Sequence, residues 1–93
     1  MLIRYFGAAK AAAGAEEERL AAGSLEAPTL HALLEHLAAR PAAETGTAPE
    51  GAPGLKSVIS RSTFLVNEFA ARDRSVQLTD ADTVDILPPF AGG

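Results

Sequence analysis

One pattern between residues 29 and 41 limits what this chain can fold into more than any other. Four leucines recur at the spacing i, i+3, i+4 and i+7, namely Leu30, Leu33, Leu34 and Leu37. This spacing places them along one side of an α-helix. Thr29 can cap the first turn, Arg40 favours the last turn, and Pro41 cannot continue the helix. We therefore predict a helix from about Thr29 to Arg40 that must bury its apolar side against another layer.

Short apolar runs predict that the other layer is a β-sheet. The predicted strands are residues 2–6, 16–22, 63–66 and 83–87, and the short segments 69–70 and 76–78 remain ambiguous. Alternation turns Ile3 and Tyr5 toward the helix, because Arg4 would not enter the core, and it turns Val84 and Ile86 inward in the same way. Short helical turns are predicted at 8–13, ended by a left-handed Gly14, and at 55–60.

This order of elements predicts an α+β fold of the β-grasp (ubiquitin-like) type. One main helix would pack across a mixed sheet, with the first and last strands side by side at its centre. Residues 41–54 contain three prolines and three glycines but no large apolar side chain, so we expect a mobile loop there. Neither side of that loop is long enough to fold alone, so a single domain over residues 1–93 is expected.

Composition excludes several classes of function. The sequence has no cysteine, which removes disulfides, thiolate metal sites and a cysteine nucleophile. The net charge is −4 and the basic residues are dispersed, so nucleic acid is not an expected partner. No apolar run approaches the ~20 residues of a membrane span, and the first residues do not form a secretory signal, so a cytoplasmic protein is expected. We expect no metal, because His31 and His36 lie on different sides of the helix, and no other bound cofactor.

The most informative segment follows the last strand. It reads Pro88, Pro89, Phe90, Ala91, Gly92 and Gly93. Two prolines end strand pairing and keep the chain extended, so that the last four residues span up to about 14 Å. A carboxylate on Gly93, next to Gly92, has no side chain beside it and can enter a narrow channel. Adenylation with ATP would activate this carboxylate, and sulfide or a persulfide could then convert it to a thiocarboxylate.

Three segments resemble the MoaD/ThiS family of ubiquitin-like sulfur carriers. They are residues 5–14, residues 65–68 and the closing residues 80–93, and the resemblance covers the chain except for the 41–54 loop. Within the family, Pro88 and Pro89 and the alanine-rich turn after the first strand resemble the MoaD branch, the small subunit of molybdopterin synthase. ThiS, the thiamine branch, is typically shorter and lacks both features. In the turn before the last strand, Ala81 replaces the glycine that is usual in the family.

The resemblance implies a carrier that is not an enzyme by itself. Gly93 would be adenylated by an E1-like partner similar to MoeB, which consumes the ATP, and would become a thiocarboxylate. A MoaE-like large subunit would then accept the tail and pass the sulfur to a pyranopterin precursor in molybdenum cofactor biosynthesis. Other acceptors remain open, namely thiamine, cysteine or a secondary metabolite, as do a ubiquitin-like protein modifier and a non-catalytic interaction module.

The partner surface is predicted on the sheet face opposite the helix. Alternation places Phe6, Leu65 and Leu87 together there, and the tail would add Pro88, Pro89, Phe90 and Ala91 to the contact. Arg4 and Asp85 share this face on adjacent strands. We expect them to form an exposed ion pair that orients the partner.

Overall fold

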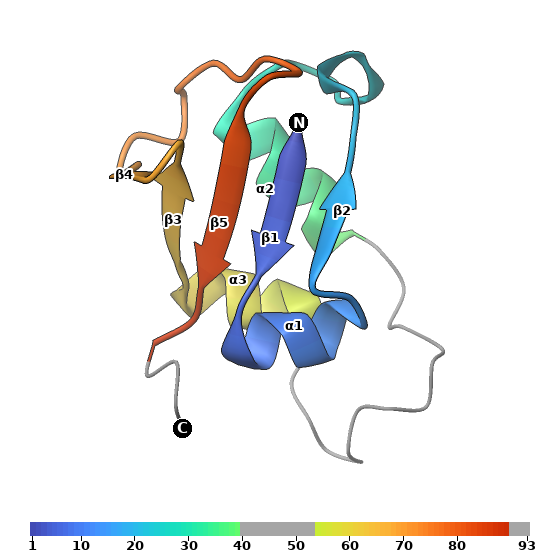
Figure 1. The fold of residues 1–93 in the computed structure, drawn as a ribbon, viewed down its shortest axis with the longest axis vertical. Helices are drawn as coiled ribbons and strands as arrows, with labels where there is room; N and C mark the ends of the chain where they lie inside the picture. The colour runs from blue at the N-terminus through green and yellow to red at the C-terminus, as the bar shows by residue number, and fades with distance from the viewer. Residues whose placement is uncertain (40–53, 90–93) are drawn as a thin grey trace.

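The computed structural model describes residues 1–39 and 54–89 (Figure 1). Their elements are, in order, β1 (Leu2–Tyr5), α1 (Gly7–Ala13), β2 (Glu17–Arg19), the 3-10 turn η1 (Ala22–Ser24), α2 (Leu30–Ala38), α3 (Leu55–Arg61), β3 (Thr63–Val66), β4 (Phe69–Ala70) and β5 (Thr83–Leu87). The strands form one sheet in the order β2-β1-β5-β3-β4. The predicted α+β, β-grasp architecture is confirmed, with α2 as the longest helix.

The two central strands come from opposite ends of the sequence. β1 runs parallel to β5, with Ile3 beside Val84 and Arg4 beside Asp85. β2 and β3 then flank this pair in antiparallel orientation. The chain therefore leaves the centre of the sheet at the end of β5, and the last two described residues follow this strand (Figure 1).

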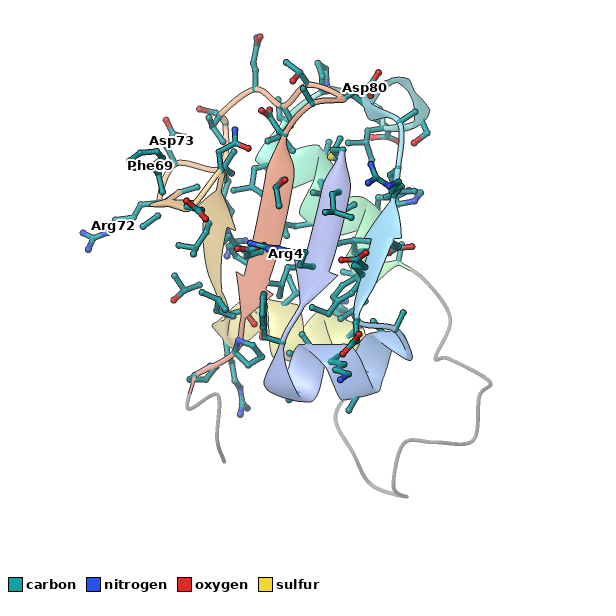
Figure 2. The ribbon with its side chains drawn as sticks, viewed as in Figure 1. Arg4, Phe69, Arg72, Asp73 and Asp80 are labelled. Carbon is teal, nitrogen blue, oxygen red and sulfur yellow. The ribbon has the colours of Figure 1, made fainter. Side chains whose placement is uncertain are left out.

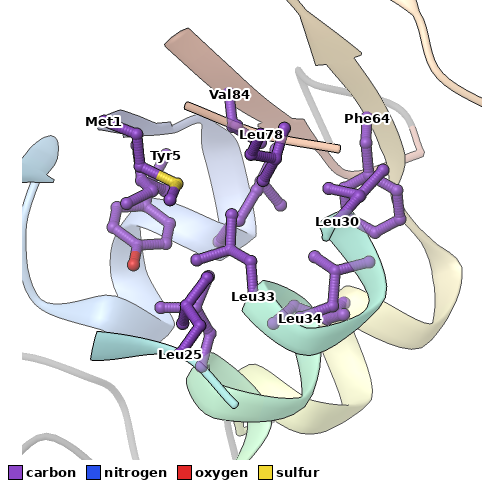
Figure 3. Packing of buried hydrophobic residues seen from close by; sticks show 14 of the residues in the cluster. Met1, Tyr5, Leu25, Leu30, Leu33, Leu34, Phe64, Leu78 and Val84 are labelled. Carbon is purple, nitrogen blue, oxygen red and sulfur yellow. The ribbon is translucent and has the colours of Figure 1, made fainter. Parts of the chain in front are cut away.

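The core lies between the sheet and α2, which crosses behind the sheet in the view of Figure 1. The four leucines of the stripe are at most 3% exposed, and Ile3, Val84 and Ile86 are fully buried. Tyr5 and Phe64 complete the same cluster (Figure 3). Val66 packs against this cluster and is half-buried. The prediction that the helix covers the inward side chains of β1 and β5 is confirmed.

The predicted helix ends need one correction. Thr29 caps α2 as expected, since its side-chain oxygen accepts a hydrogen bond from the Ala32 amide. The helix ends at Ala38, with Ala39 as its C-cap, and Arg40 lies outside the described residues. Gly14 ends α1 in the left-handed conformation, as predicted, with φ of 75°.

One predicted strand is shorter in the structure than expected, and one ambiguous segment does not form a strand. The predicted strand 16–22 is reduced to β2, because only residues 17–19 pair with β1 and the chain then turns into η1. The ambiguous segment 76–78 forms only one isolated bridge, between Gln77 and Thr29. Leu78 is nevertheless buried, because its amide donates to the Pro28 carbonyl and its side chain joins the core. Of the predicted loop 41–54, only Gly54 lies among the described residues, and it is exposed.

A polar network ties the β3–β4 turn to the start of β5. Asn67 and Glu68 both have positive φ, 52° and 73°. The Asn67 side chain donates to Asp82 and accepts from the Thr83 amide, at 2.8 and 2.9 Å. Asp82 also accepts from the Thr79 amide, which closes the turn before β5. These hydrogen bonds lower the pKa of the Asp82 carboxyl, and the hydrogen bond from Asn67 contributes most to this shift.

The network should make stability depend on pH in acid. Because the folded state lowers the pKa of Asp82, the stabilisation is complete at neutral pH and is lost as the pH falls below about 4. Asn67→Gly keeps the positive φ accessible and removes the main hydrogen bond to the carboxylate. We expect it to cost on the order of 1 kcal/mol at pH 7 and less near pH 2. Urea unfolding at both pH values measures this, and an equal cost at both would show that Asp82 is not the group involved.

Candidate functional site

The strand that leads to the tail is anchored firmly to the domain. Val84 and Ile86 of β5 are fully buried, and β5 pairs with a strand on each side. Pro88, the first residue after β5, is buried too, whereas Pro89 is exposed. Both prolines border a mainly apolar groove that is also lined by Ala8, Ser57, Val58 and Arg61. The chain is therefore held against α1 and α3 immediately before Phe90.

The remaining tail residues, Phe90, Ala91, Gly92 and Gly93, lie outside the described residues. Their roles stay predictions. The burial of Pro88 limits its own predicted contribution, because a side chain enclosed by this chain offers little surface to a partner. Its place against α1 and α3 instead fixes the point from which the tail starts.

The three apolar side chains of the predicted partner surface do share the sheet face opposite α2. The register places Leu65 opposite Asp85, and Leu87 two residues further along β5 on the same face. Phe6 continues the alternation of β1, in extended conformation, and its amide donates to the Ile86 carbonyl. Phe6 is 38% exposed, and Leu65 and Leu87 are half-buried. We call this side of the sheet the outer face.

Arg4 and Asp85 occupy the middle of the outer face, and Figure 2 shows Arg4 in front of the sheet. Arg4 Nε donates to Asp85 Oδ1 at 2.5 Å, and Nη2 donates to Oδ2 at 2.7 Å. The prediction of an exposed pair is wrong for one partner. The Asp85 side chain is only 5% exposed, against 38% for Arg4. The hydrogen bonds that Asp85 accepts from Arg4, and then the charge of Asp85, raise the pKa of Arg4, with smaller contributions from Glu68 and Glu17.

Sequence reasoning missed one exposed aromatic side chain. Phe69 is 78% exposed on β4, at the edge of the sheet (Figure 2). It pairs with Val66, which faces the core, so alternation alone would have turned it inward. β4 contains only two residues at the sheet edge, and nothing there covers the ring. Phe69 is not part of the outer face.

The described residues also bear on other kinds of site. Within residues 1–39 and 54–89, no group of three or more His, Asp or Glu side chains is arranged to hold a metal ion. In the same ranges no helix is long and apolar enough to cross a membrane. His31 and His36 are both exposed, and the His31 imidazole lies 3.8 Å from the Glu35 carboxylate.

Comparisons with known proteins agree with this arrangement. A model of the ThiS family matches residues 3–93, nearly the whole chain. Among solved structures, one chain of a complex of subunits 1 and 2 of molybdopterin-converting factor from Helicobacter pylori superimposes with a TM-score of 0.63 at 22% identity, covering 99% of this chain and 96% of that one. At this identity the likeness shows the fold alone. No curated protein matches the sequence. The chain therefore belongs to the ThiS family.

Proposed function

We propose that this protein carries sulfur as a thiocarboxylate on Gly93 and donates it in molybdopterin biosynthesis. The observation that supports this most is that the family match extends through Gly93, beyond the strand that anchors the tail. Gly92 would let the chain pass through a narrow channel, since it has no side chain. The folded domain then serves as the part that the partner proteins bind, and the chemistry takes place in those partners.

The proposed reaction needs no acid, base or metal from this chain. A carboxylate oxygen of Gly93 attacks the α-phosphate of ATP in a MoeB-like adenylating enzyme, and pyrophosphate leaves. The acyl-adenylate is then attacked at its carbonyl carbon by sulfide or a persulfide sulfur, and AMP leaves with the carbon–oxygen electron pair. When a persulfide is the donor, a reductant or a second thiol releases the thiocarboxylate.

The choice of molybdopterin as the destination rests on two features. Pro88 and Pro89 precede the tail, which is the pattern on which the MoaD resemblance was based. The H. pylori chain with the same fold comes from a complex of the two subunits of molybdopterin-converting factor. A MoaE-like large subunit is accordingly the second proposed partner. Transfer to a pyranopterin precursor, compared with transfer to a thiamine precursor, tests the destination.

Intact-mass spectrometry tests the carrier step directly. After incubation with an E1-like adenylating enzyme, ATP and a sulfur source, the mass should rise by the difference between sulfur and oxygen, and fragmentation should place the gain on Gly93. The same enzyme acting on another carrier is the positive control. No gain with a proven enzyme would leave an interaction module, and conjugates on a denaturing gel would indicate a protein modifier instead.

The outer face should carry the contact with the large subunit. Phe6→Asp places a carboxylate on that face, next to Leu87, and should weaken the complex at least tenfold, because a charge would be desolvated on docking. Phe6 is already 38% exposed, so the thermal midpoint should change little. Calorimetry with the MoaE-like subunit of the same organism measures the affinity.

Phe69→Asp is the matched control for this variant. It makes the same change at a phenylalanine that is 78% exposed but lies on β4, outside the outer face. We expect it to bind as tightly as the wild type. Equal weakening by both variants, or by neither, would show that the docking surface has been assigned to the wrong face.

A further inference from the structure

The outer face carries an ion pair at its centre. One row of paired residues crosses the sheet from Glu17 through Arg4 and Asp85 to Leu65. Phe6 lies beside this row, with its ring centroid 5.9 Å from the Arg4 guanidinium carbon. A partner that covers Phe6, Leu65 and Leu87 must therefore also cover Arg4.

The ion pair with Asp85 uses only some of the N–H groups of Arg4. A guanidinium has five N–H groups in a rigid plane, and Asp85 accepts from Nε and from Nη2. Among the described residues no other acceptor bonds to Arg4, and its side chain remains 38% exposed. The Asp85 side chain is 5% exposed and accepts hydrogen bonds along one edge of the planar guanidinium. The direction of the remaining N–H groups of Arg4 is therefore fixed before any partner arrives. Donors that are buried without an acceptor are costly, so the partner has to supply one.

Charge decides which acceptor fits. Asp85 and Glu17 flank Arg4 on the neighbouring strands, and the charge of Glu68 also acts on Arg4. The exposed Arg19 lies two residues from Glu17, beside Leu2, and is another cation on this part of the face. Around Arg4 itself, a carboxylate from the partner would therefore meet more negative than positive charge, whereas a neutral carbonyl would not be repelled. We propose that the docking partner places an uncharged carbonyl oxygen, from its main chain or an amide side chain, against the free N–H groups of Arg4. In this arrangement Asp85 is a positioning residue. The inference rests on the proposed function, because it concerns the partner that receives the tail.

The test replaces the pair by apolar side chains of similar size. Arg4→Met alone would leave the Asp85 carboxylate buried without its partner, so it is combined with Asp85→Val. We expect the double variant to keep the thermal midpoint within a few degrees and to bind the MoaE-like subunit about tenfold or more weakly, because a hydrogen bond to a charged donor is lost. Binding as tight as that of the wild type would overturn the inference. If the double variant fails to fold, Arg4→Lys serves instead: it keeps a cation beside Asp85 without the planar fork, and the same weakening is expected.

A second variant separates a carbonyl from a carboxylate. Glu17→Gln with Glu68→Gln removes two negative charges near Arg4 and leaves the pair with Asp85 intact. If the partner presents a carbonyl, this variant should bind no more tightly than the wild type. Tighter binding would show that the partner presents an anion and would overturn that part of the proposal. In every case the wild-type mass gain on Gly93 is measured in parallel, so that failure of the carrier function is distinguished from failure of this contact.

Discussion

Truncation of Leu37 to alanine is expected to lower the free energy of unfolding by about 2–5 kcal/mol. Leu37 has no exposed surface and belongs to the cluster that joins α2 to β1 and β5. The variant removes buried methyl groups and leaves a cavity that the neighbouring side chains of a close-packed core fill only in part. α2 itself should still form, because alanine favours helix. Urea unfolding followed by circular dichroism gives the difference.

His36→Ala is the matched control for this truncation. His36 neighbours Leu37 in sequence but is exposed on the other side of α2. The substitution should change the free energy of unfolding by less than about 0.5 kcal/mol, because it alters an exposed side chain outside the core. A urea midpoint of Leu37→Ala that matched the control would contradict the packing of α2 across the sheet.

The sequence alone allowed the core to be predicted because two periodicities agree in it. The leucine stripe needs an apolar surface, and alternation in β1 and β5 supplies one through Ile3, Tyr5, Val84 and Ile86. The same alternation placed Phe6, Leu65 and Leu87 on the opposite face. These are local signals, and each can be read within a few residues.

The features that could not be predicted depend on long-range register. Asp85 is buried because Arg4, 81 residues earlier in the chain, lies beside it and covers it. A pattern within β5 shows only that Asp85 faces outward. The burial of Pro88 likewise requires α1 and α3 to meet the end of β5. The strand predicted at 16–22 is shorter for a related reason, since β2 keeps its pairing only where β1 lies opposite it.

The strongest functional effect is expected from changes at the end of the tail. Addition of one residue after Gly93 should abolish the mass gain, because the carboxylate moves about 3.5 Å from its required place and acquires a neighbouring side chain. Gly92→Val should impair the gain severely, because a β-branched side chain restricts the backbone angles and widens the tail. Neither change touches the described core, so both variants should keep the wild-type thermal midpoint. Intact-mass spectrometry after incubation with the adenylating enzyme measures the mass gain of both variants and of the wild type.

Gly23→Val provides the matched control for Gly92→Val. A Cβ atom added at Gly23 would meet no atom within 4 Å apart from its chain neighbours, and the residue lies in η1, outside the outer face and the tail. This variant should gain the same mass as the wild type at the same rate. If Gly92→Val and the extended chain also gained mass normally, the enzyme would not be enclosing the tail in a narrow channel. The diglycine would then lack the steric role that we assign to it, even though Gly93 carried the sulfur.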